Sequence, residues 1–76
     1  MKVIVYSTDN CPFCRAAKDL LTGKGIRFRE VDVSEENQFD QLVQKTGWKT
    51  VPQIFIDGQL IGGFQELLQW EADGKL

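Results

Sequence analysis

Apolar and polar residues follow two different rhythms in the first part of the chain. Residues 3–6 are apolar at consecutive positions, which is typical of a strand covered on both faces. Residues 12–21 instead carry apolar side chains three and four positions apart, which predicts a helix with one buried face, ended by Gly23 and Gly25. The positions expected on that face are Phe13, Ala16, Ala17, Leu20 and Leu21.

Residues 26–33 predict a second strand, because apolar and charged side chains alternate along most of this segment. Ser34 is the expected N-cap of a second helix, whose first turn carries Glu35 and Glu36, the charge that a helix N-terminus favours. Gly47 is expected to end this helix. Its expected inner stripe is Phe39, Leu42, Val43 and Thr46.

The last part of the chain predicts a hairpin followed by a third helix. Residues 53–56 and 59–61 are strand-like and are separated by Asp57-Gly58, the composition of a two-residue primed turn. Gly62-Gly63 then leads into a helix that ends near Gly74. Its expected inward positions are Phe64, Leu67, Leu68 and Ala72.

The predicted order is therefore β-α-β-α-β-β-α, an α/β fold. A right-handed crossover should make the first two strands parallel, and the terminal hairpin should be antiparallel. These connections predict a mixed four-stranded sheet with helices on both faces.

Composition narrows the class of protein. The 76 residues suffice for one domain, and 42% hydrophobic with 26% charged residues is ordinary for a globular protein. A net charge of −2 and the lack of a basic stripe argue against nucleic acid as the main partner. The longest apolar run is too short to span a membrane, and no signal peptide is recognised, so a cytoplasmic location is expected.

The only two cysteines stand three positions apart in Cys11-Pro12-Phe13-Cys14, at the start of the first predicted helix. Pro12 suits the first helical turn, which places Cys11 at the helix N-terminus and Cys14 one turn further on the same side. Unpaired N–H groups and the helix dipole favour the thiolate of Cys11, which is therefore the predicted nucleophile. Cys14 is expected to stay protonated until it resolves a mixed disulfide.

Other uses of the cysteine pair fit less well. A disulfide closing so short a loop would remove little entropy from the unfolded chain, and a reducing compartment disfavours it. A zinc site within one chain lacks further Cys or His ligands, because the sequence has no histidine. A metal or cluster shared between chains and an inert pair of thiols remain as alternatives. The C-x-x-C spacing near a βαβ pattern favours redox chemistry.

Three motifs together carry a family resemblance: CPFC at 11–14, TVPQIFIDG at 50–58 and GGF at 62–64. With them the sequence resembles the glutaredoxins, within the thioredoxin-like fold, over essentially its whole length. The usual family motif is CPYC, so Phe13 lacks only a hydroxyl. The resemblance implies a single glutaredoxin domain over residues 1–76 and thiol–disulfide oxidoreductase activity. It implies glutathione as co-substrate and no permanently bound cofactor.

The resemblance also implies where glutathione binds. Pro52 is expected to be cis, which leaves the Val51 backbone free to pair with an extended substrate beside Cys11. Glycines before the last helix would let a carboxylate approach its N–H groups. Without the resemblance, a trans Pro52 at a strand edge and a simple glycine bend are the alternatives. The residues assigned to glutathione are Phe13, Thr50, Val51, Pro52, Gly63, Phe64 and Gln65.

The chain departs from the family pattern at both ends of this site. Many glutaredoxins carry a lysine shortly before the first cysteine, where this chain has Thr8-Asp9-Asn10. Many also carry aspartate after the paired glycines, where this chain has Gln65-Glu66. Lys49 and Arg15 are the cations considered as compensation. Trp48 precedes the TVP motif and can flank the groove, but an aromatic ring at the core edge is the commoner role, as for Trp70.

These departures keep two other functions open. One is a glutaredoxin-like redoxin that thioredoxin reductase reduces and that serves ribonucleotide reductase. The other is a dimer that shares a [2Fe–2S] cluster through Cys11 and glutathione. The favoured prediction remains a monomeric glutaredoxin whose partners are glutathione and disulfide-containing client proteins.

Overall fold

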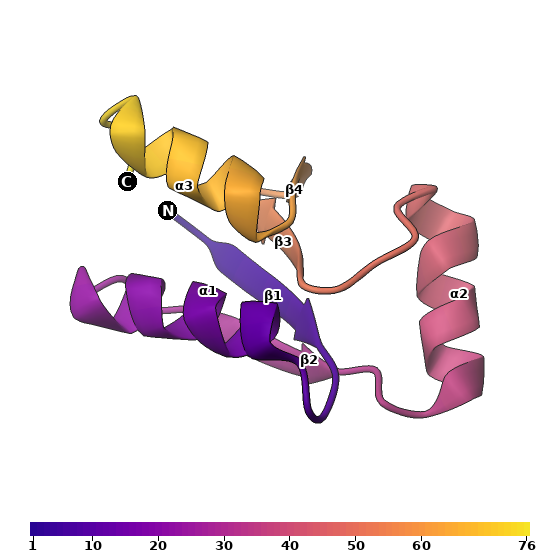
Figure 1. The fold of residues 1–76 in the computed structure, drawn as a ribbon. Coiled ribbons are helices and arrows are strands. Elements are labelled where there is room, and N and C mark those ends of the chain that lie inside the picture. The colour runs from indigo at the N-terminus through magenta and orange to yellow at the C-terminus, as the bar shows by residue number, and fades with distance from the viewer.

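A computed structural model describes all residues from Met1 to Leu76 (Figure 1). Its strands and helices follow the predicted order, β-α-β-α-β-β-α. The elements are β1 (Val3–Ser7), α1 (Pro12–Gly23), β2 (Arg29–Asp32), α2 (Glu36–Thr46), β3 (Gln53–Ile56), β4 (Gln59–Gly62) and α3 (Phe64–Ala72).

The strands form one sheet in the order β2-β1-β3-β4. β1 pairs in parallel with β2 and antiparallel with β3, and β3 pairs antiparallel with β4. Asp57 and Gly58 in the hairpin turn have φ angles of 51° and 84°, the positive values that a type I′ turn requires. The predicted mixed four-stranded sheet and its hairpin are confirmed.

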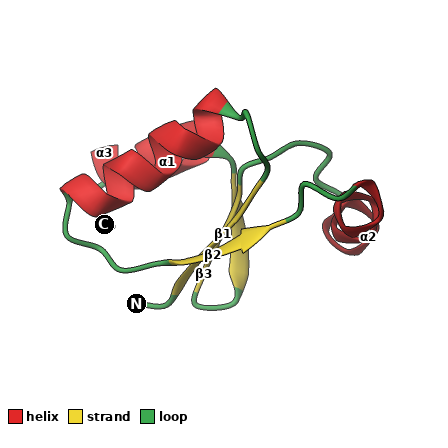
Figure 2. Ribbon diagram, turned by 90° about the horizontal axis from the view of Figure 1, so that it is seen from below, coloured by secondary structure: helices red, strands yellow, loops and turns green.

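Helices α1 and α3 lie side by side over one face of the sheet (Figures 1 and 2). Both contribute apolar side chains to the same buried cluster as the two central strands, β1 and β3. The cluster consists of Val3, Val5, Ala17, Leu21, Ile54, Ile56 and Leu67. This packing fixes the N-terminus of α1 beside the end of β1, where both cysteines lie.

Helix α2 lies apart from the other two helices, beyond the end of the sheet where β1 ends (Figures 1 and 2). Gly47 follows it with a φ of 73°, and its N–H donates to the Val43 carbonyl at 2.8 Å. Leu42 is buried, and the other three predicted inward positions are half-buried. The chain then returns to β3 past the cysteines.

The second strand is shorter than predicted. It spans Arg29–Asp32 rather than residues 26–33, because its pairing with β1 begins at Arg29 opposite Ile4. Ile26 and Phe28 pack against the core from an irregular segment instead. The alternation of apolar and charged residues therefore predicted correctly which side chains are buried, but it predicted a longer paired strand than the structure has.

The predicted N-cap of α2 is wrong. Glu35 holds that position, and it makes no side-chain capping bond. The Ser34 hydroxyl is used elsewhere: it donates to Asp32 Oδ1 and accepts the Asp9 N–H at 2.9 Å. These contacts tie the loop before α1 to the loop after β2.

Three helical positions predicted to face inward are exposed. Phe13 is 61% and Leu68 39% exposed, and Ala72 is exposed as well. Leu68 and Ala72 share the side of α3 opposite Trp70, whose ring packs on the core and takes the inward position. Phe13 belongs to the first turn of α1, beside Phe64.

Candidate active site

Cys11 is the N-cap of α1, with Pro12 in the first turn as predicted. The Cys14 N–H donates to Cys11 Sγ at 3.2 Å. An acceptor at the N-cap takes a helix N–H that would otherwise lack a partner. The sulfur is half-buried and lies where the peptide dipoles of α1 favour negative charge.

Cys14, unlike Cys11, is almost completely buried. It is 1% exposed, and both cysteines are free thiols. Burial, followed by the hydrogen bond with Cys11, raises the pKa of the Cys14 thiol to about 12. Cys14 is therefore protonated at neutral pH, as predicted, and the two sulfurs differ in readiness to react.

A cis peptide bond joins Val51 to Pro52, as predicted. The Val51 carbonyl oxygen lies 3.8 Å from Cys11 Sγ. Val51 precedes β3 and pairs with no strand, so an extended ligand can pair with its backbone beside the sulfur.

Hydrogen bonds to neighbouring residues hold the segment before Val51 in place. The fully buried Gln53 donates its Nε2 to the Trp48 carbonyl at 2.7 Å. The Trp48 N–H donates to Thr46 Oγ1 at 3.1 Å, and that hydroxyl donates to the Leu42 carbonyl at 3.0 Å. The end of α2 is thereby tied to the start of β3, which fixes the turn against Cys11.

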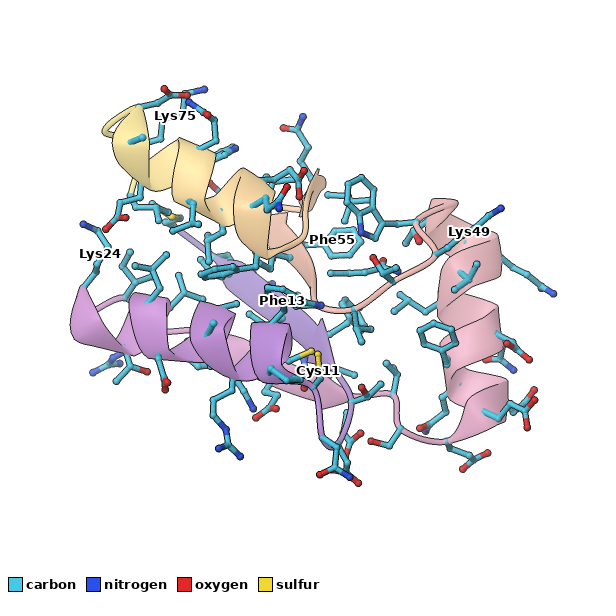
Figure 3. The ribbon with its side chains drawn as sticks, in the orientation of Figure 1. Cys11, Phe13, Lys24, Lys49, Phe55 and Lys75 are labelled. Atoms are coloured by element: carbon cyan, nitrogen blue, oxygen red, sulfur yellow. The ribbon has the colours of Figure 1, made fainter.

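A groove of about 390 Å³ opens between this turn, the first turn of α1 and the N-terminus of α3. Phe13 projects from α1 toward α3, where its ring centroid lies 6.2 Å from that of Phe64 (Figure 3). The structure brings together every residue that was predicted to bind glutathione. The residues that line the groove are Phe13, Trp48, Thr50, Val51, Pro52, Gly63, Phe64, Gln65 and Glu66.

Glycine keeps one wall of the groove open. A Cβ atom at Gly63 would lie 3.4 Å from the Pro52 carbonyl oxygen. At Gly62, φ is 125° and a Cβ would lie 2.6 Å from Glu66 Cγ, so this position requires glycine.

Two lining residues were not assigned to the site from the sequence. The Trp48 Nε1 is buried and has no hydrogen-bond partner. Glu66 Oε1 accepts the Gly63 N–H at 2.8 Å, which folds this carboxylate over the start of α3. A glutamate three positions after a helix N-cap is a known capping pattern and could have indicated this fold-back.

No lysine or arginine lines the groove. Lys49 is exposed outside it, and Arg15 lines a different cavity, so neither provides the compensation considered from the sequence. Glu66 is the charged residue of the groove.

A smaller, polar cleft of about 150 Å³ lies on the other side of the cysteines. It is formed by the end of β1, the following loop, α1 and β2. Lys18 Nζ lies 2.7 Å from Glu30 Oε2, and the Ser7 hydroxyl donates to the same oxygen at 2.7 Å. The lining residues are Ser7, Thr8, Asp9, Asn10, Cys11, Cys14, Arg15, Lys18, Glu30 and Asp32.

No group of three or more His, Cys, Asp or Glu side chains is arranged to hold a metal ion. No helix has the length and apolar character needed to cross a membrane.

The fold and the two unequal thiols define a dithiol oxidoreductase with a thioredoxin-like fold. The glutaredoxin family profile matches residues 3–61. Glutaredoxin 3 of Escherichia coli strain K12 is 40% identical over 75 residues, which cover 97% of this chain and 90% of that protein. Glutaredoxin 1 of Rickettsia typhi is 42% identical over 77 residues, covering 97% of this chain and 74% of that protein. This chain therefore belongs to the glutaredoxin family of thiol–disulfide oxidoreductases.

Solved structures agree with the sequence relatives. The buckwheat glutaredoxin–glutathione complex superposes with a TM-score of 0.87 at 33% identity, covering 97% of this chain and 71% of that one. The solution structure of glutaredoxin from Brucella melitensis gives a TM-score of 0.84 at 38% identity, covering 99% and 83%. The predicted thioredoxin-like fold is confirmed.

Proposed function

We propose that this chain reduces protein disulfides and glutathione mixed disulfides, with glutathione as its co-substrate. The observation that carries the proposal is the position of Cys11 Sγ, at a helix N-terminus and 3.8 Å from the carbonyl oxygen of Val51, a residue that pairs with no strand. One element favours the thiolate, and the other aligns an extended disulfide beside it.

Two routes follow from the unequal thiols. With a glutathione mixed disulfide, the Cys11 thiolate attacks the glutathione sulfur, and the client leaves as a thiolate and takes up a proton. A second glutathione thiolate then attacks the enzyme-bound glutathione sulfur, which releases oxidised glutathione and the Cys11 thiolate. With a protein disulfide, the Cys11 thiolate attacks one client sulfur, and the other client sulfur leaves as a thiolate. The Cys14 thiolate then attacks Cys11 Sγ, the bond from Cys11 to the client sulfur breaks, and this second client sulfur also leaves as a thiolate. Two glutathiones reduce the intramolecular disulfide that has formed.

Each wall of the groove would contact a different part of glutathione. The Val51 N–H and carbonyl, next to Thr50 and Pro52, would pair with the cysteinyl backbone of the tripeptide. The free N–H groups of Phe64 and Gln65 at the start of α3, reached past Gly63, would take a carboxylate. Phe13 would cover the apolar middle of the ligand. A relative of this fold is known in complex with glutathione, which supports the assignment.

The roles of the two cysteines are separated by substitution. We expect Cys11→Ser to abolish turnover of both substrate classes, because no nucleophile remains. Cys14→Ser should lose protein-disulfide reduction and keep deglutathionylation, because glutathione replaces the resolving thiol. Turnover of a glutathionylated peptide and of insulin is measured with each variant. Equal loss of both activities in Cys14→Ser would contradict the proposed roles.

A second candidate is the redoxin that thioredoxin reductase reduces and that serves ribonucleotide reductase. The absence of a lysine or arginine from the groove favours it, since glutathione carries two carboxylates. Oxidised protein is incubated with glutathione, glutathione reductase and NADPH, or with thioredoxin reductase and NADPH. We expect faster NADPH consumption with the glutathione system, and the reverse order would replace our proposal with this candidate. Either role suits a monomer in a reducing compartment such as the cytoplasm.

A further inference from the structure

The resolving step requires Cys14 to lose its proton in a buried position, where the thiolate is unfavourable. Only a thiolate attacks a disulfide, yet Cys14 is 1% exposed and burial raises the pKa of its thiol to about 12. A neighbouring positive charge would make the attack easier by stabilising the thiolate as it forms.

The polar cleft provides such a charge. Cys14 and Lys18 are four positions apart on α1, hence on the same side of the helix, and both line the cleft. Burial and the hydrogen bond with Cys11 raise the pKa of the Cys14 thiol, and a hydrogen bond with the Thr8 backbone and, to a smaller extent, the charge of Lys18 lower it.

Lys18 is held in place. Its side chain is 31% exposed, and Nζ lies 2.7 Å from Glu30 Oε2. The Ser7 hydroxyl, in a residue 2% exposed, donates to the same carboxylate oxygen at 2.7 Å. Glu30 belongs to β2 and Ser7 to β1, so two strands fix a lysine on the facing helix. The charged residues that line the cleft around the thiols are Asp9, Arg15, Lys18, Glu30 and Asp32.

We propose that Lys18, held by Glu30 and Ser7, is a positioning residue for the resolving step, where its ammonium group stabilises the Cys14 thiolate. Cys14 loses its proton to water in the cleft, and its sulfur attacks Cys11 Sγ. The Cys14–Cys11 bond forms, the bond from Cys11 to the client sulfur breaks, and the client leaves as a thiolate. The proposal rests on the cysteine roles proposed above and does not depend on glutathione binding.

The test uses dithiobis-nitrobenzoate, an aromatic disulfide that releases a coloured thiolate at each step. Reduced protein releases one nitrothiobenzoate when Cys11 attacks and a second when Cys14 resolves the mixed disulfide. We expect Lys18→Met to slow the second release about tenfold, the equivalent of one pKa unit of thiolate stabilisation. The first release should keep its rate, and Lys18→Arg should restore most of the second.

Two more variants sharpen the result. Lys18→Gln keeps a donor toward Glu30 without the charge, and it should slow the second release as much as Lys18→Met does. Lys24→Met is the matched control, because Lys24 is also ion-paired, 3.3 Å from Glu71, but follows the far end of α1. It should leave both releases unchanged.

Three kinds of outcome would overturn the proposal. One is an unchanged second release in Lys18→Gln. Another is an equal slowing of both releases, or a Lys18→Arg variant as slow as Lys18→Met, since either indicates a structural role. The third is a single release from the wild-type protein, which would also remove the resolving role of Cys14 from the proposed function. Failure of glutathione to act as reductant would leave this test unaffected.

Discussion

The two cavities beside the cysteines differ in nearly every physical property. The groove is the larger, at about 390 Å³ against about 150 Å³ for the cleft, and no residue lines both. Three aromatic residues and the Thr50–Pro52 turn line much of the groove, which holds one charged side chain, Glu66. Five charged side chains surround the cleft. We therefore expect one side to recognise the substrate by shape and backbone pairing, and the other side to stabilise charge during the reaction.

The sharpest way to separate the two sides is to fill the groove. Gly63→Val adds a side chain whose Cβ would lie 3.4 Å from the Pro52 carbonyl oxygen, and the Gly63 backbone (φ −100°) accepts valine without strain. We expect kcat/KM for a glutathionylated peptide to fall about tenfold to a hundredfold, the equivalent of 1–3 kcal/mol of overpacking.

The release of nitrothiobenzoate by Cys14 should be unaffected in the same variant. Gly23→Val is the control, because nothing lies within 4 Å of a Cβ at that position. Unchanged turnover of the glutathionylated peptide by Gly63→Val would show that substrates bind elsewhere.

The buried thiol of Cys14 predicts that the folded protein loses stability at alkaline pH. Because burial raises the pKa of Cys14 to about 12 in the folded protein, the thiol ionises first in the unfolded chain, from about pH 8.5. Stability is fully present below that pH and falls above it, by about 1.4 kcal/mol per pH unit until the folded pKa is reached. Urea unfolding of reduced protein should show this slope in the wild type and lose it in Cys14→Ala. Parallel curves for the two proteins would contradict the assignment.

The charge of the groove predicts a smaller effect. Glu66→Gln removes the carboxylate near the N-terminus of α3 and keeps a side chain that can cap the helix. We expect kcat/KM for a glutathionylated peptide to rise about threefold, because repulsion of the glutathione carboxylate is relieved at a partly exposed site. The gain should shrink as salt is added. Glu71→Gln, further along α3, is the control, and a lower activity in Glu66→Gln would refute this explanation.

The smallest effect concerns the ion pair of the cleft. The hydrogen bonds from Lys18 and Ser7 lower the pKa of Glu30, so its contribution to stability is present above about pH 4.3 and lost as the pH falls toward the lowered value. The carboxylate is 42% exposed, and solvent limits the contribution to less than about 1 kcal/mol. Acid unfolding should be slightly shallower in Glu30→Gln than in the wild type. Asp19→Asn, which removes an unpaired carboxylate from α1, should leave the curve unchanged.

The sequence contained enough to predict the fold and the reactive sulfur. Hydrophobic periodicity located every strand and helix, and Pro12 after Cys11 indicated a helix N-terminus with a thiol at its mouth. Periodicity gave the wrong start for β2, because a residue can be buried without pairing in a sheet. Phe28 is such a residue: it is partly buried but does not belong to a strand.

The candidate site was predicted less completely, for a physical reason. Its motif residues are adjacent in sequence, but the charges around it come from separate elements. Glu30 reaches Lys18 across the gap between a strand and a helix. Local patterns do not encode such a distance, so this contact did not follow from the sequence, whereas the fold-back of Glu66 on Gly63 is a local capping contact that the sequence contained.

The separation of the two cavities has a consequence for large substrates. A folded client that covers the groove buries Phe13 and the Val51 turn, and of the residues that line the cleft it need contact only Cys11, to which it is bonded. Water can still enter from the opposite side and carry away the hydrogen ion that Cys14 gives up. A bulky client can therefore bind tightly on one side of the sulfurs without preventing the loss of the Cys14 proton on the other side.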